Sequence, residues 1–157
     1  MKTILAVTAA ITLCAGSAFS QSSSTTTTVT GANGQTATRT ATRGNGQTDV
    51  TVTGANGQTA TRSTDRYAGG KSTTVTGPNG QTASRTVTGR GTGDVNVTAT
   101  GPNGQTATRD TTRYAGGHST TVTGPNGNVA NRTVTGRGTG SATVSRSGPR
   151  GTVVRHR

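Results

Sequence analysis

The chain has 157 residues, a formal net charge of +12 and an aromatic content of only 2%. Its single Cys excludes an internal disulfide and a metal site built from several thiolates. Its hydrophobic content of 25% argues against a conventional globular core and against the compact enzyme folds that depend on one.

Residues 1–20 have the pattern of a secretory signal peptide. Lys2 supplies the positive charge, residues 4–13 form a short apolar run that is expected to be helical, and Ala18 and Ser20 place small side chains at the two cleavage positions. Cleavage is predicted before Gln21. The apolar run is too short to span a membrane, and no later segment qualifies, so the mature chain is predicted to be extracellular, periplasmic or attached to the cell surface.

Beyond residue 20 the chain lacks Cys, Leu, Ile, Met, Phe and Trp. Its large apolar residues are thirteen Val among 137 residues. Burying a Val contributes about 1.5–3 kcal/mol at best, whereas ordering each residue costs about 1–2 kcal/mol. Composition alone therefore predicts that the mature chain is partly disordered in isolation.

A tandem repeat follows a Ser/Thr-rich leader at residues 21–27. The block TVTGANGQTATR at residues 28–39 returns in variant form from residues 51, 74, 98 and 121, so that residues 28–144 hold five repeats of 23–24 residues. A degenerate sixth copy and a basic tail occupy residues 145–157. This regular spacing is typical of a repeat protein rather than of a merely biased composition.

Each repeat predicts a β-hairpin. In residues 77–80, Gly-Pro-Asn-Gly, the residue types suit a type I turn closed by a G1 bulge, which would pair Thr76 with Thr82 and Val75 with Ala83. A second turn, Tyr-Ala-Gly-Gly or Arg-Gly-Thr-Gly, follows each block. Two turns in each repeat predict eleven or twelve short strands in succession.

The period-two alternation predicts two unlike faces. Val75, Ala83, Arg85 and Val87 would point one way, and the Thr and Ser residues between them the other way. We therefore expect an all-β chain of tandem short hairpins that forms a single-layer meander or a β-solenoid-like array. The alternative is a chain that stays disordered until copies assemble into cross-β fibres.

The arginines recur at fixed positions of the repeat and predict a surface that binds polyanions. A second Arg position, at residues 43, 66, 90, 113 and 137, follows the first. The candidate partners are a second copy of the chain, an anionic polysaccharide, lipopolysaccharide or extracellular nucleic acid. The alternative is that Arg keeps the chain in solution and protects sheet edges. The candidate residues are Arg39, Arg62, Arg85, Arg109, Arg132, Arg146, Arg150, Arg155 and Arg157.

Rows of Thr-x-Thr form a second candidate surface. A flat array of hydroxyls at these positions resembles the Thr-x-Thr faces of hyperactive antifreeze proteins, a resemblance that implies binding to ice or another crystal surface. The alternative is that Thr serves only as a polar strand former. The rows consist of Thr28, Thr30, Thr51, Thr53, Thr74, Thr76, Thr98, Thr100, Thr121 and Thr123.

No residue pattern predicts catalysis, a metal site or a cofactor. Gly70-Lys71-Ser72 resembles the end of a phosphate-binding loop, but the first glycine of that motif is replaced by Asp65. His118 and His156 lack companion ligands. No small-molecule substrate is indicated. The sequence predicts a non-catalytic secreted repeat protein with a structural role, with ice binding and a flexible spacer as alternatives.

Overall fold

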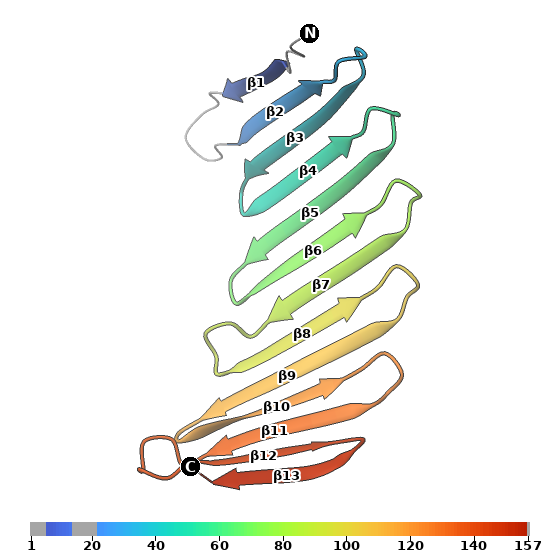
Figure 1. Cartoon of the computed structure of the whole chain (residues 1–157). Helices are drawn as coiled ribbons and strands as arrows, with labels where there is room; N and C mark the ends of the chain where they lie inside the picture. The colour runs from blue at the N-terminus through green and yellow to red at the C-terminus, as the bar shows by residue number, and fades with distance from the viewer. Residues whose placement is uncertain (1–5, 14–21, 157) are drawn as a thin grey trace. The chain divides into compact units, whose positions relative to one another are not determined.

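The computed structural model describes residues 6–13 and 22–156, which form one open antiparallel sheet (Figure 1). Each strand is hydrogen-bonded to the strands that precede and follow it in the chain. The strands are β1 (Ala6–Leu13), β2 (Ser23–Thr30), β3 (Thr36–Gly44), β4 (Gln47–Thr53), β5 (Thr59–Tyr67), β6 (Gly70–Thr76), β7 (Thr82–Thr88), β8 (Asp94–Thr100), β9 (Thr106–Tyr114), β10 (Gly117–Thr123), β11 (Val129–Thr135), β12 (Thr143–Gly148) and β13 (Gly151–His156).

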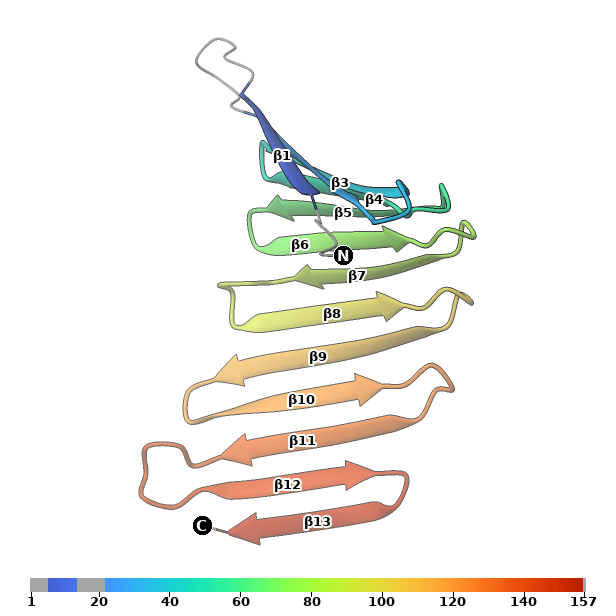
Figure 2. The same ribbon diagram turned by 45° about the horizontal axis from the view of Figure 1, so that its top comes forward.

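The meander is confirmed, and the solenoid-like alternative is not what forms. Strands that succeed one another in the chain lie side by side in one layer (Figure 2). A solenoid would instead bring together equivalent strands from successive repeats. Beyond residue 21 the described residues form twelve strands, which agrees with the expected eleven or twelve.

The expected N-terminal helix is not shown. Ala6–Leu13 form strand β1, in which Val7 pairs with Val29 of β2. Four of its eight residues are Val, Ile or Thr, which suit a strand, and the segment is too short to be stable as an isolated helix. The rest of the signal-peptide pattern lies outside the described residues. The described part of the chain has no helix that is long and apolar enough to cross a membrane.

The chain divides into two compact units. The first unit extends to Tyr67 and includes Thr73–Thr82, and the second comprises Ala68–Ser72 and the chain from Ala83 onward. The first therefore contains β1–β5, and the second contains β8–β13 and all of β7 except Thr82, while the residues of β6 are divided between them.

The hairpin turns have the predicted conformation. The N–H of Gly31 donates to the carbonyl of Gln35 at 2.8 Å, and the N–H of Gly34 donates to that of Gly31 at 3.0 Å. Gly34 has φ of 76°, as the G1 bulge requires. The same bonds recur at the equivalent glycines of the other four repeats. The turn sets the predicted register, since Thr30 pairs with Thr36, and Thr100 pairs with Thr106 in a later repeat.

The two faces are confirmed, and they separate the charges. We call the face with the Val, Ala and Arg side chains the arginine face and the opposite face the hydroxyl face. Strand pairing places Arg85 opposite Ala99 and Val87 opposite Val97. All four acids lie on the hydroxyl face: Asp49, Asp65, Asp94 and Asp110. The strand arginines lie on the arginine face: Arg39, Arg43, Arg62, Arg66, Arg85, Arg109, Arg113, Arg132, Arg146 and Arg155.

One position of the repeat is buried in every copy. It lies on the arginine face, two residues after the first Arg of each repeat, and is occupied by Ala41, Thr64, Val87, Thr111 and Val134. Val87 and Val134 are each only 3% exposed. Because the described residues form a single layer, their cover comes from the same face, where long Arg stems can lie over apolar neighbours. We call these five residues the buried column.

Substitution of two glycines in the β11–β12 loop tests the geometry of this loop. Gly136 and Gly138 have φ of 77° and 89°, so Ala is strained at both. A Cβ on Gly136 would also overlap the carbonyl oxygen of Ser141, whereas one on Gly138 would meet nothing within 4 Å. We expect Gly138→Ala to cost about 1 kcal/mol and Gly136→Ala at least about 2 kcal/mol more. Urea unfolding measures both, and equal losses would contradict the described loop.

Candidate anion-binding site on the arginine face

Arg side chains flank the buried column on both sides. In the first unit Arg39 and Arg43 lie two residues before and after Ala41 on β3. In the second unit Arg109 and Arg113 bracket Thr111 in the same way on β9. Adjacent strands are about 4.8 Å apart, so equivalent positions in successive repeats are about 9.6 Å apart. Within each unit the guanidinium groups therefore recur at regular intervals across the strands.

Backbone hydrogen bonds outside the strand ladders hold the second Arg in four of the five repeats. In the second unit the N–H of Arg113 donates to Gly93 O at 2.9 Å, and that of Arg137 donates to Gly116 O at 2.9 Å. Arg137 lies in a loop rather than in a strand, because β11 ends at Thr135. The Thr139 hydroxyl closes this loop: its oxygen lies 2.9 Å from Gly136 O and 3.2 Å from Ser141 O, and its one proton can be donated to either carbonyl. Through this loop the backbone N–H of Arg137 bonds to a turn glycine, as the N–H of Arg113 does.

A hollow of about 640 Å³ lies where these arginines converge in the second unit. Its floor includes the buried Thr111 and Thr120, whose hydroxyls are 3.3 Å apart. Its cationic lining comes from β9, β11, β12 and the β11–β12 loop, with one imidazole from β10. These side chains are Arg109, Arg113, Arg132, Arg146, Arg137 and His118. We call this hollow the His118 hollow.

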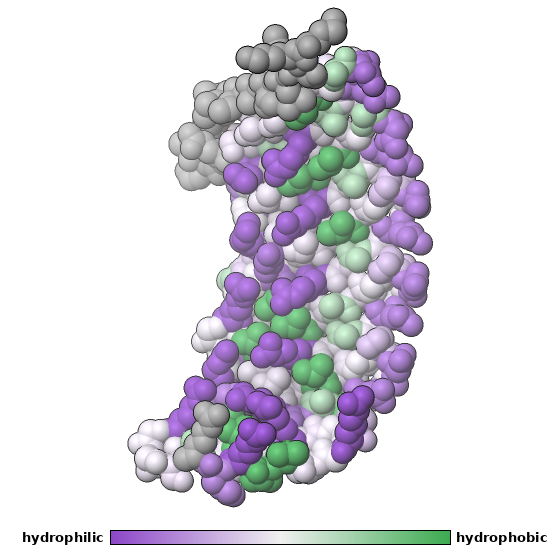
Figure 3. All heavy atoms as spheres, viewed as in Figure 1, coloured by the Kyte–Doolittle hydropathy of each residue, from purple (hydrophilic) through white to green (hydrophobic). Residues whose placement is uncertain are grey.

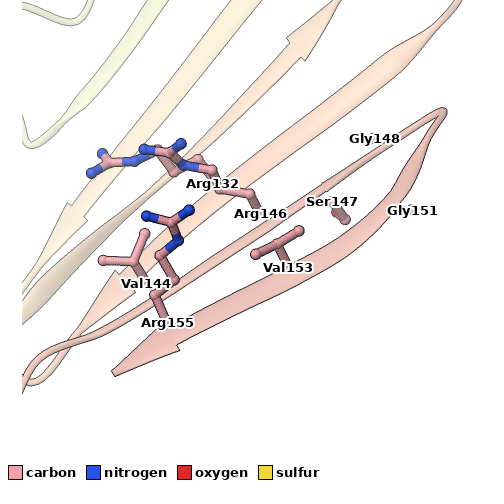
Figure 4. Close-up of a pocket in the computed structure, with 8 residues that line it drawn as sticks. All are labelled: Arg132, Val144, Arg146, Ser147, Gly148, Gly151, Val153 and Arg155. Carbon is pink, nitrogen blue, oxygen red and sulfur yellow. The ribbon is translucent and has the colours of Figure 1, made fainter. Parts of the chain in front are cut away.

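A second hollow of about 480 Å³ continues toward the edge of the sheet. It shares Arg132 and Arg146 with the His118 hollow and adds Arg155 of β13 (Figure 4). Figure 4 shows the three guanidinium groups gathered on one side of β11–β13. Val144 and Val153 supply its apolar lining. Hydrophobic side chains among hydrophilic ones are also evident in the space-filling view of the chain (Figure 3).

The contact of His118 with Arg132 fits a neutral imidazole. The His118 Nε2 lies 2.8 Å from a terminal nitrogen of Arg132, which can only donate, so Nε2 accepts and the ring proton is on Nδ1. Partial burial, followed by the charges of Arg137, Arg132, Arg113 and Arg109, lowers the pKa of His118 below its ordinary value.

The structure brings only part of the predicted polyanion-binding set together. Arg109, Arg132, Arg146 and Arg155 line the two adjoining hollows. The remaining residues are distributed elsewhere. Arg85 is on β7, Arg39 and Arg62 are on the arginine face of the first unit, Arg150 is in the β12–β13 turn, and Arg157 lies outside the described residues.

Three of the six basic side chains that line the His118 hollow were not among the predicted site residues, and neither were Thr111 and Thr120. The three basic residues are Arg113, Arg137 and His118. The sequence does carry a signal for them, because Arg113 and Arg137 belong to the second recurring Arg position. His118 also matches Lys71 at the offset of 47 residues that relates residues 51–97 to residues 98–144.

The Thr-x-Thr rows lie on the hydroxyl face, as predicted. Cross-strand hydroxyls are 3.2 Å apart in the pairs Thr53–Thr59 and Thr100–Thr106. The array is less uniform toward the C-terminus, where Thr121 is flanked by Asp110 and Asn131. The amide of Asn96 also donates to the Asp110 carboxylate on this face. Hydroxyls thus dominate the face without filling it.

Within residues 6–13 and 22–156 there is no group of three or more His, Cys, Asp or Glu that could hold a metal ion. The two hollows bring six Arg side chains together on the arginine face. Comparison of the chain with protein-family models, curated proteins and solved structures gives no match.

Proposed function

We propose that the protein is a non-catalytic extracellular structural protein that binds anionic polymers through its arginine face. The observation that carries this proposal is the separation of charge, with the strand arginines on one face and all four acids on the other. A surface of one sign attracts polymers of the opposite sign and releases their condensed counterions on contact.

The regular spacing favours a linear polymer over a compact partner. Within each unit the Arg positions recur across the strands, so a chain of anionic groups lying across the strands can contact several of them. Aromatic residues make up only 2% of the sequence, which leaves little surface for stacking on nucleic-acid bases. Recognition of this kind depends on charge and spacing rather than on base sequence.

Self-association is the second part of the proposal. Strand β13 (Gly151–His156) is the last strand in the sheet order, and all six of its residues are exposed. Val153 is 56% exposed and Val154 is 50% exposed. Such an edge can pair with a strand of a second copy. A bound polyanion would favour this pairing, because it neutralises the repulsion between the Arg side chains of neighbouring copies.

Heparin binding tests the proposal directly. We expect the protein to bind immobilised heparin at low salt and to elute as the salt concentration rises. Analytical ultracentrifugation with and without heparin measures assembly in the same buffers. The proposal would be overturned if the protein stays monomeric and binds neither heparin nor DNA at low salt.

The paired hydroxyls of the hydroxyl face favour ice or crystal binding as a second candidate function. An ice-recrystallisation assay is expected to show slowed grain growth if the Thr rows bind ice. Thr98→Lys with Thr100→Lys should then abolish the effect, because a charged side chain interrupts the array. Arg85→Lys, on the opposite face, is the control. Unchanged grain growth at high protein concentration would dismiss this function.

Circular dichroism separates both functions from the flexible-spacer alternative. We expect the chain from Gln21 onward to give the same strand signal at low and high protein concentration, because its hairpin turns are locally encoded. Strand signal only at high concentration would show that assembly supplies the missing core. Coil signal at both concentrations would favour the spacer.

A further inference from the structure

We propose that the His118 hollow binds a phosphate group that carries two negative charges. The proposal rests on the proposed function, because it names the anion that this part of the arginine face would select. It goes beyond general polyanion binding, which does not require a compact site for a single anionic group.

The number and kind of donors match a phosphate. Five guanidinium groups line the hollow, and each presents a planar fork of N–H donors that fits two phosphate oxygens. A phosphate monoester near pH 7 carries a charge of about −1.5 to −2 and offers three acceptor oxygens. A sulfate ester or a carboxylate carries a single charge. The convergence of several arginines therefore favours the more highly charged group.

The floor of the hollow supports a compact ligand. Thr111 and Thr120 are buried at its base, and the Thr111–Thr120 hydroxyl pair can donate to an oxygen above it. No acid faces the hollow, since Asp94 and Asp110 lie on the opposite side of the sheet. The charge of the arginines is therefore not neutralised by carboxylates on this face.

His118 adds a proton-dependent contact. In the free site its Nε2 accepts from Arg132, and Arg109 and Arg113 of β9, Arg132 of β11, Arg146 of β12 and Arg137 of the loop all line the same hollow. A bound dianion offsets the repulsion between these cations and the imidazolium. The protonated ring then donates to a phosphate oxygen, and the Arg132 N–H that it releases can do the same.

The sign of the pH dependence follows from this contact. The surrounding cations and partial burial hold the pKa of His118 down in the free protein, and the dianion raises it. Binding therefore takes up a proton. Because the phosphate itself takes up a proton near pH 6, the contribution of His118 is measured as the affinity relative to a variant without the imidazole. This ratio should increase as the pH falls from neutral through the range below 6.5, the ordinary value for His.

The chain itself suggests the variant that isolates this contact. Lys71 occupies the position that matches His118 in the preceding copy of the long repeat, so His118→Lys is compatible with the local fold. This variant places a permanently charged cation at the position and removes the titrating imidazole. Arg113→Gln with Arg137→Gln removes two of the five guanidinium groups from the hollow. Arg39→Gln with Arg62→Gln is the control, because it removes the same charge from the first unit.

The test is an NMR titration of the full chain with phenyl phosphate and with phenyl sulfate, which have similar shapes and different charges. Phenyl phosphate should saturate the signals of His118, Thr111 and Thr120 and bind roughly ten-fold more tightly than phenyl sulfate. The Arg113/Arg137 variant should lose roughly ten-fold in affinity, and the Arg39/Arg62 variant less than about two-fold. Between pH 7.5 and 5.5 the affinity of the wild type should rise relative to that of His118→Lys.

Any one of four outcomes would overturn the site. They are equal affinity for the two probes, chemical-shift changes spread evenly over both units, equal losses in the two Arg variants, and the same pH dependence in His118→Lys as in the wild type. Heparin binding by the same samples separates the two proposals. Heparin binding without saturable phosphate binding refutes the site alone. Loss of both refutes the proposed function, and phosphate binding without heparin binding leaves the site intact but contradicts the function.

Discussion

Replacing Arg109, Arg113, Arg132 and Arg137 together with Gln is expected to weaken heparin binding by roughly a hundred- to thousand-fold at low salt. The four side chains converge on one hollow, so their contacts with a polyanion are lost together. The slope of log K against log salt concentration should decrease by about 3, since each lost contact contributes about 0.7–0.9. Isothermal titration calorimetry at several salt concentrations measures both quantities.

The matched control places the same change of net charge outside the arginine face. Asn33, Asn56, Asn79 and Asn103 each occupy the third position of a hairpin turn, where Asp is tolerated. Changing all four to Asp lowers the net charge by the same amount and leaves the arginine face intact. We expect this variant to lose less than about ten-fold in affinity. Equal losses in the two variants would show that net charge, and not the face, governs binding.

Shortening two residues of the buried column should produce the largest loss of stability. Val87→Ala with Val134→Ala is expected to cost about 4 kcal/mol, because each Val is only 3% exposed and loses two methyl groups from a filled space. The two sites lie on different hairpins, β7–β8 and β11–β12, so their effects should be nearly additive. Urea unfolding followed by circular dichroism gives the change in midpoint.

The exposed edge strand supplies the control for this prediction. Val153→Ala with Val154→Ala removes the same atoms from side chains that are 56% and 50% exposed, and should cost less than about 1 kcal/mol in total. Similar losses for the two pairs would show that the arginine face does not shield its buried column in solution.

The hairpins and their register could be predicted because their causes are local. Gly-Pro-Asn-Gly and Gly-Ala-Asn-Gly restrict φ within four residues, and the turn length then determines which Thr faces which. Once the register is set, alternation assigns each side chain to a face, so the Val, Ala and Arg side chains could be separated from the hydroxyls in advance. The choice between a meander and a solenoid could not be made, since the same period-two pattern serves both.

The composition of the His118 hollow and the burial of the column depended on the assembled sheet. Arg113, His118 and Arg137 lie up to 24 positions apart in the sequence. They meet because pairing of β9, β10 and β11 is combined with a loop whose glycines adopt positive φ. Val87 and Val134 are covered although the composition predicts no core, because Arg stems from neighbouring strands can lie over them. Local chemistry sets turns and faces, whereas contacts between distant residues arise only after many strands have paired.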